Sequence, residues 1–399
     1  MGRQLGRGGA GMVVRRPPAP ARQAQILAVA AERFHRSGYH QVSMTEVAAG
    51  VGITAPALYR HFRGKPELLD RVVRLGLGEL TTALHAAGST EAVGAALAAV
   101  AVGHRPLGTL MQRDARLLPP ARRAALRGEL RADAALMAGV LRAERPELPP
   151  ADAEFLCWSA LSVCSGLSYQ SAVPQPRRAE RLLRELVAAV LAVSLDGAAP
   201  DPRTASAVAG PRPQPRREEL LAAAVRLFHR HGFDNVSTDQ LGAEVGISGP
   251  SVYRHFASKQ QLLAASLVRS RERLWHEVAG AIDAAAGPAA ALEAGLAAYV
   301  GFARHNGDYL GAMLSETERL AAPDRRAAVD FRRDFLRTWV DLLRRVRPEC
   351  DAAEARIRVH ALFALVNDGV RNRPYSERPD LGDCLRRLGR AVLGVPAQT

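Results

Sequence analysis

Apolar residues recur every three to four positions along most of this chain, which is the spacing of amphipathic helices. The segment 23–37, for example, carries Ile26, Ala30 and Phe34 on one helical face, and Gly38 follows as a residue suited to end a helix. Ala and Leu dominate the composition, and only 5% of the residues are aromatic. Both features favour helix packing over sheets, so we predict an all-α fold.

Two short helices are predicted after Gly38. Ser43 and Glu46 have the spacing of a capping box, which places the start of a helix at Ser43. That helix should end near Gly52, and Thr54 is the next candidate N-cap, with Pro56 in the first turn where its missing N–H is harmless. A helix, a short helix, a glycine turn and a second short helix have the order of a helix-turn-helix.

The same pattern occurs twice. With an offset of 194, residues 22–69 align with 216–263 without a gap, and 22 of the 48 aligned residues are identical. Ser237 and Gln240 repeat the capping box, and Ser248 repeats the second N-cap. Such a long repeat indicates a duplicated domain rather than a solenoid. It divides the chain into a first and a second half of roughly 195 residues each.

The only two lysines of the chain, Lys65 and Lys259, occupy the same place in the two copies. They close the segments YRHFRGK and YRHFASK, and every other basic residue is arginine. A compact ammonium at a helix start is suited to a single phosphate. The alternative is that duplication simply copied the lysine.

The net charge of +14 suggests a polyanionic partner, first of all nucleic acid, although the excess arginine could instead be solvated helix surface. The four cysteines form no CxxC pair, so neither a zinc site nor a disulfide framework is indicated. No apolar run of about 18 residues occurs, and we expect a soluble cytosolic protein without a membrane partner. No catalytic constellation, cofactor loop or metal-ligand cluster is recognisable, so we expect no enzyme, cofactor or metal.

Composition also sets the expected domain boundaries. Residues 1–21 are rich in Gly, Arg and Pro without an acid, which is typical of a disordered basic arm, and residues 196–215 read as a Pro-rich linker. The repeats define two DNA-binding modules, 22–82 and 216–276. Helical regulatory domains are expected at 83–195 and 277–395.

The repeated segments resemble the TetR family of transcriptional regulators. The resemblance rests on FHRSGYHQVSMTEVAAGVGITAPALYRHFRGKPELL (34–69) and FHRHGFDNVSTDQLGAEVGISGPSVYRHFASKQQLL (228–263). It implies two TetR-like halves, each with a helix-turn-helix domain followed by a helical ligand-binding and dimerisation domain. A typical member has one such module and pairs as a homodimer on a palindromic operator, whereas this chain carries two.

The resemblance also implies residue roles on double-stranded DNA. Phosphate contacts are implied for Tyr59, His61, Lys65, Tyr253, His255 and Lys259, and for Ser43, Thr45, Ser237 and Thr238 at the start of the first short helix. Base edges are implied for Thr54, Ala55, Ala57, Ser248, Gly249 and Ser251, while Arg60 and Arg254 could reach base or phosphate. The alternative for the histidines is packing or capping, and for the arginines a solvated surface.

In this family the last two helices pair as a four-helix bundle. The candidates are 151–172 with 177–194, and 350–372 with 380–395, so one chain could form an intrachain pseudo-dimer, with a homodimer as the alternative. A small apolar ligand is expected in a regulatory domain, where the second half offers more aromatic residues. These are Trp275, Tyr299, Phe302, His305, Tyr309, Met313, Trp339, His360 and Phe363, although aromatic residues at helical spacing are more often core.

The leading interpretation is a repressor that a ligand releases from an imperfect palindromic operator. An architectural DNA-binding protein without ligand response is the alternative, and a small-molecule carrier with vestigial DNA contacts is a third. A cavity in the helical domains would favour the first, and solid packing the second.

Overall fold

The computed structural model describes residues 19–170, 175–200, 215–372 and 375–396. All regular secondary structure within these ranges is helical, as predicted. The chain forms two compact units, Met1–Val72 and Val73–Thr399. Most of the predicted basic arm and of the Pro-rich linker lies outside the described residues. The first helix begins at Ala19, inside the segment that was assigned to the arm.

The first unit is a helix-turn-helix. It consists of α1 (Ala19–Ser37), α2 (Met44–Val51), α3 (Ala55–Tyr59) and the start of α4 (Lys65–His85). Ile26, Ala30 and Phe34 of α1 are fully buried, together with Leu58 of α3. The apolar face that the sequence predicts for 23–37 is therefore the face that packs the core.

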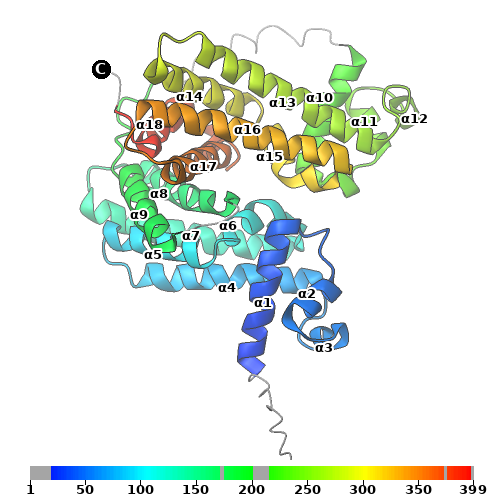
Figure 1. The fold of residues 1–399 in the computed structure, drawn as a ribbon, viewed down its shortest axis with the longest axis horizontal. Coiled ribbons are helices and arrows are strands. Elements are labelled where there is room, and N and C mark those ends of the chain that lie inside the picture. The colour runs from blue at the N-terminus through cyan, green and yellow to red at the C-terminus, as the bar shows by residue number, and fades with distance from the viewer. Residues whose placement is uncertain (1–18, 171–174, 201–214, 373–374, 397–399) are drawn as a thin grey trace, which may run out of the picture. The chain divides into compact units, whose positions relative to one another are not determined.

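The second unit contains both regulatory domains and the second module (Figure 1). In the first half, the helices after α4 are α5 (Thr90–Gly103), α6 (Leu107–Thr109), the π-helical turn η1 (Leu110–Asp114), η2 (Ala115–Leu117), α7 (Pro120–Glu144), α8 (Pro150–Ser165), η3 (Gly166–Tyr169) and α9 (Pro176–Leu191). The second module contains α10 (Arg216–His231), η5 (Phe233–Asn235), α11 (Thr238–Glu244), α12 (Gly249–Val252) and the start of α13 (Lys259–Asp283). The remaining helices are α14 (Pro288–His305), α15 (Gly307–Glu316), η6 (Thr317–Arg319), α16 (Ala322–Val346), α17 (Ala352–Gly369), η7 (Tyr375–Glu377) and α18 (Leu381–Leu393).

The last helices of the two halves pack on each other within the chain. In this arrangement α8 contacts α17 and α9 contacts α18, while the other face of α17 packs on α16 (Figure 1). Gly166 permits the closest approach, because a Cβ at this position would lie 2.8 Å from the backbone of His360 and Ala361. The four segments that the sequence singled out for pairing therefore form one intrachain interface.

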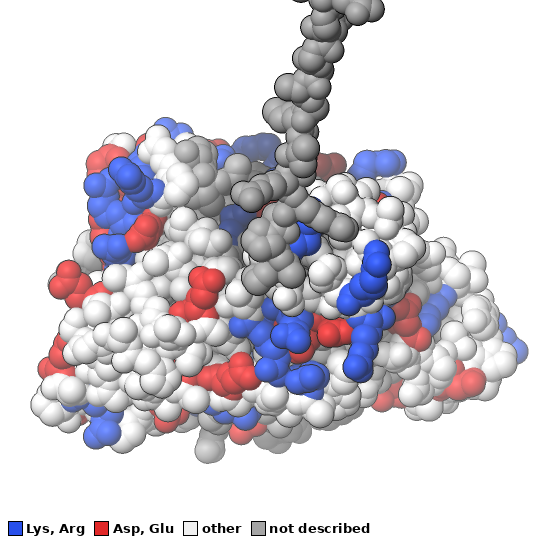
Figure 2. All heavy atoms as spheres, turned by 90° about the horizontal axis from the view of Figure 1, so that it is seen from below, with Lys and Arg blue, Asp and Glu red and all other residues white. Residues whose placement is uncertain are grey.

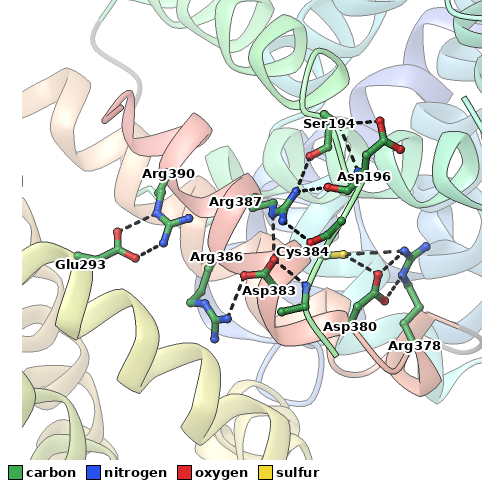
Figure 3. Close-up of polar contacts among 12 residues, drawn as sticks. Ser194, Asp196, Glu293, Arg378, Asp380, Asp383, Cys384, Arg386, Arg387 and Arg390 are labelled. Carbon is green, nitrogen blue, oxygen red and sulfur yellow. Dashed lines mark hydrogen bonds and ion pairs between the residues drawn. The ribbon is translucent and has the colours of Figure 1, made fainter. Parts of the chain in front are cut away.

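Residues 194–199, which follow the last helix of the first half, form hydrogen bonds with α18 at this interface. The guanidinium of Arg387 on α18 donates to the carbonyl oxygens of Ser194, Asp196 and Gly197 at 2.9–3.3 Å, as Figure 3 shows. The N–H of Ala199 donates to Asp383, which also accepts from Arg387. The segment 194–199 is thus held on a helix of the second half.

Ion pairs between the halves surround the apolar contact. Arg378 pairs with Asp152 at 2.7 Å, and its guanidinium lies 5.0 Å from the ring centre of Phe155. Arg178 pairs with Asp351 at 2.5 Å near the start of α17. These pairs join oppositely charged residues from different halves, and this helps to fix which surfaces meet.

Among the described residues, no single helix is long and apolar enough to cross a membrane. One bent pair, Thr90–Gly103 with Leu107–Leu117, reaches the required length and hydropathy only together, with an angle of 88° between its parts.

Candidate nucleic-acid interface and ligand cavities

The first short helix of each module begins with the predicted capping box. In α2 the Glu46 N–H donates to Ser43 Oγ at 3.1 Å, and the Ser43 N–H donates to the Glu46 carboxylate at 2.7 Å. Ser237 and Gln240 make the same reciprocal pair at the start of α11. Accepting from Ser43 lowers the pKa of the Glu46 carboxyl. Both turns then pass through glycines with positive φ, Gly52 at 72° and Gly246 at 70°.

The second short helix of each module exposes a matching set of polar side chains. Tyr59 is 53% exposed and Tyr253 is 54% exposed, although tyrosine rings are usually covered. The arginine and the histidine that follow each tyrosine are also exposed: Arg60, His61, Arg254 and His255. Among the described residues, none of these six side chains has a hydrogen-bond or ion-pair partner. Each module therefore presents a Tyr-Arg-His set that its own fold does not use.

Most of the other candidate DNA contacts are also accessible. Ser43, Thr45, Thr54, Ser237 and Ser248 are exposed, and Ala55, Ala57, Thr238 and Ser251 are half-buried. Thr54 caps α3 by accepting from the Ala57 N–H, whereas Ser248 Oγ shares a 2.8 Å hydrogen bond with Ser251 Oγ.

Gly249 differs from the expectation that it faces a base edge, because it is buried. A Cβ at Gly249 would lie 1.8 Å from the Asp239 carboxylate, so Asp239 covers this position. In the first module the residue that corresponds to Asp239 is Thr45. The second module therefore places a negative charge beside the start of its recognition helix.

The two lysines have partners inside their own modules. Lys65 Nζ donates to the carbonyl oxygens of Tyr39 at 2.7 Å and Val42 at 2.9 Å, and lies 4.4 Å from the Tyr39 ring centre. Lys259 Nζ makes the same contacts with Phe233 and Val236. Each ammonium thus links the start of the fourth helix of its module to the loop before the capping box. The sequence did not predict this structural role.

A cavity of about 730 Å³ lies in the second half, and it is called the second-half cavity below. Of the nine residues expected around a ligand, Tyr299, Met313, His360 and Phe363 line this cavity. The other five do not line it. Phe302, Tyr309 and Trp339 are buried in the core, His305 is exposed, and Trp275 is 40% exposed. Helical periodicity identified the group of aromatic residues, but it could not distinguish the residues that line the cavity from those that are buried in the core.

A second cavity of about 400 Å³, the first-half cavity, lies in the half that the sequence offered as the poorer of the two candidate sites. Leu97, Met111 and Trp158 form part of its apolar wall, and Asp368 and Arg371 reach it from the second half. Asp368 accepts from Gln112 at 2.5 Å and pairs with Arg371 at 2.9 Å. Burial raises the pKa of the Asp368 carboxyl. No local sequence signal joins residues that are about 250 positions apart.

Helix α15 connects the second-half cavity with the second module. Its residues Leu310, Met313 and Leu314 line the cavity, and the helix packs along α10. His229 of α10 lies against Gly311, where a Cβ would be 2.0 Å from the imidazole. Burial lowers the pKa of His229 to about 4, so the ring is neutral at neutral pH.

Glu316, at the end of α15, joins three parts of the second unit. Its carboxylate is buried, accepts from the Phe233 N–H of the second module at 3.3 Å, and pairs with Arg116 of the first half at 2.5 Å. Lys259 donates to the carbonyl oxygen of the same residue, Phe233. The backbone of Phe233 is therefore held by Glu316 through its N–H and by Lys259 through its carbonyl.

The net charge of +14 is not gathered in a single basic field on the face that Figure 2 shows, where basic and acidic side chains lie interspersed.

Comparison with known proteins matches the two modules to one family. Residues 26–72 and 220–266 each match the family described as bacterial regulatory proteins, tetR family. Among curated relatives, 72 residues are 36% identical to the transcriptional activator FasR of Mycolicibacterium smegmatis, covering 18% of this chain and 33% of FasR. A stretch of 79 residues is 34% identical to the regulator BetI of Agrobacterium fabrum, covering 20% of this chain and 38% of BetI. The match thus spans about a third of each of these relatives.

Among solved structures, a TetR-family transcriptional regulator from Bordetella parapertussis aligns with a TM-score of 0.41 and 19% identity, over 45% of this chain and 94% of the other. The family pattern is present twice, each time on a helix-turn-helix, so the chain carries two helix-turn-helix modules of the tetR family of bacterial regulatory proteins.

Proposed function

We propose that this protein is a cytoplasmic, sequence-specific DNA-binding transcriptional regulator whose two modules read the two half-sites of one operator. The observation that carries the proposal is the pair of exposed Tyr-Arg-His sets, which have no partner within the described residues of the fold. Tyrosine hydroxyls and cationic side chains at the end of a recognition helix are suited to phosphates, while the first residues of the helix meet base edges.

The operator is expected to be an imperfect palindrome, because the two recognition helices differ at their groove-facing starts. Ala57 offers only a methyl group, which suits a thymine methyl, whereas Ser251 can donate or accept at several bases. Selection of binding sites from random DNA would test this prediction. Unequal half-sites support it, and a perfect palindrome that is insensitive to exchanging Ala57 and Ser251 contradicts it.

The contribution of each module is tested by Tyr59→Ala and Tyr253→Ala. Each substitution should weaken binding to the selected operator about tenfold, since a hydrogen bond to a charged group contributes about 1.5–3 kcal/mol. Fluorescence anisotropy of labelled operator DNA would measure the effect. If either variant binds as the unchanged protein does, that module does not contact the operator.

We also propose that a small molecule releases the protein from DNA. The two cavities, about 400 and 730 Å³, support this over a purely architectural role, because they are in the size range that ligands occupy. A ligand beside α15 would bear on α10 of the second module, and release requires that it bind one arrangement of these helices more tightly than the other. An operator complex that no cavity-binding compound weakens would leave the architectural alternative.

A further inference from the structure

The second-half cavity combines an aromatic floor with an arginine-rich rim. The rings of Tyr299, Phe335 and Phe363 lie within 5.1–6.0 Å of one another, centre to centre. Five arginines line the rim with one acid, Asp341: Arg332, Arg333, Arg337, Arg344 and Arg356. An apolar interior under a positive rim favours an apolar compound with a negative group.

Arg332 differs from the other four rim arginines. Arg333 pairs with Asp330 and Arg337 pairs with Asp334, and both are exposed, as are Arg344 and Arg356. Arg332 is half-buried and has no hydrogen-bond or ion-pair partner among the described residues. Burial lowers the pKa of its guanidinium. A half-buried cation without a partner is costly, and an anionic ligand would remove that cost.

Several other polar groups of the cavity wall have partners, but Gln170, which reaches the cavity from the first half, has a buried Nε2 without a hydrogen-bond partner among the described residues. The Tyr299 hydroxyl donates to Asn367 at 2.8 Å, and the Tyr169 hydroxyl donates to Gln112. Burial lowers the pKa of His360 to about 4, so this ring carries no charge at neutral pH. Arg332 and the Gln170 amide are thus the groups left to orient a ligand, and of these two only Arg332 carries a charge.

We propose that the second-half cavity binds an organic anion, with its apolar body on the aromatic floor and its carboxylate or similar group on Arg332. The proposal rests on the ligand response proposed above and names the chemical class of that ligand. The planar guanidinium can meet a carboxylate through two parallel hydrogen bonds, which gives direction as well as affinity.

Calorimetry without DNA tests the proposal with two pairs of probes, 2-naphthoate with 2-naphthamide and decanoate with decanamide. At least one anion should bind about tenfold more tightly than its neutral amide, since hydrogen bonds to charged groups are stronger than neutral ones. Arg332→Gln should remove this preference and leave the amide affinity unchanged, and Arg332→Lys should keep part of it. Arg326→Gln is the matched control, because Arg326 is exposed on the same helix and does not line the cavity, and it should change neither affinity more than twofold.

Equal binding of anion and amide, or an unchanged preference in Arg332→Gln, would overturn the assignment. A melting curve and operator binding of Arg332→Gln show whether the variant is folded, and Arg332→Lys provides the second test if it is not. Because the titration contains no DNA, its failure is separate from that of the release mechanism. An anion that binds at Arg332 but leaves operator affinity unchanged would contradict release alone.

Discussion

After α5, the first half continues as α6, the π-helical turn η1 and η2, whereas the corresponding part of the second half is the single helix α15 followed by η6. Aligned on Gly108 and Gly311, Arg113 occupies the place of Glu316, and Ala115 that of Glu318. In the structure Arg116 pairs with Glu316 at 2.5 Å, and Arg113 pairs with Glu318 at 3.0 Å. The basic residues lie in the first half and the acidic ones in the second.

This difference teaches how a duplicated chain can select its own pairing. Two copies of the first half would bring Arg116 toward Arg113 at this contact. Two copies of the second half would bring Glu316 toward Glu318, although Arg319, in the place of Arg116, would still face Glu316. Only the mixed arrangement gives opposite charges at both pairs, so specificity arises partly from repulsion in the alternatives. The two modules, in contrast, keep the same capping boxes, glycine turns and lysine contacts.

The two cavities also differ in whether their charged side chains have partners. In the first-half cavity Asp368 and Arg371 pair with each other, and Arg105 donates to the Gln170 carbonyl at 2.8 Å. In the second-half cavity Arg332 has no such partner among the described residues. The first-half cavity is therefore suited to a neutral compound and the second-half cavity to an anion.

The largest effect is expected from reversing a charge at the contact between halves. Arg116→Glu would place a carboxylate against the buried Glu316 and should cost about 3–5 kcal/mol of stability, since it leaves a buried charge uncompensated. Urea unfolding followed by circular dichroism would measure the loss. Adding Glu316→Arg should restore part of it, and Arg326→Glu on the exposed surface of α16 is the control. A loss no larger than that of the control would refute the role of the pair.

The shared lysine contacts predict a smaller effect. Lys65→Met and Lys259→Met keep the aliphatic stem but leave carbonyl oxygens without their donor, so each should cost about 1–3 kcal/mol. Thermal melting would measure this, with Arg63→Met as the exposed control. The salt dependence of operator binding then tests the phosphate role, which requires a slope lower by about one unit for each lysine. Full stability in both variants would contradict the structural role of the ammonium.

The smallest effect concerns the Asp239 carboxylate, which lies beside the start of α12 and has Thr45 as its counterpart in the first module. Asp239→Thr installs the residue found in the first module and removes a carboxylate beside the start of α12. Operator affinity should rise about fivefold, because one unfavourable charge near the phosphates costs about 1 kcal/mol in water. The reciprocal Thr45→Asp should weaken binding by a similar factor. Opposite or absent changes in anisotropy titrations would show that Asp239 does not face DNA.

The sequence predicted the elements that depend on local chemistry. The capping boxes, the glycine turns and the apolar face of α1 follow from spacing alone, and the repeat indicated two modules. The pairing of α8 and α9 with α17 and α18 was predicted only through the family resemblance. Contacts between distant positions were not predictable, since nothing in the local pattern joins Gln112 to Asp368 or Asp239 to Gly249. The lysines illustrate a related difficulty, because their position was evident but their carbonyl partners were not.

The central claim is that one chain supplies both members of the pair that meets an operator. Sedimentation equilibrium at micromolar concentration, with and without one equivalent of the selected operator, tests it most directly. We predict a particle with the mass of one chain, 42.8 kDa, that binds one operator duplex per chain. A stable particle of twice that mass, with two chains on each operator, would show that the halves pair between chains and would contradict the account.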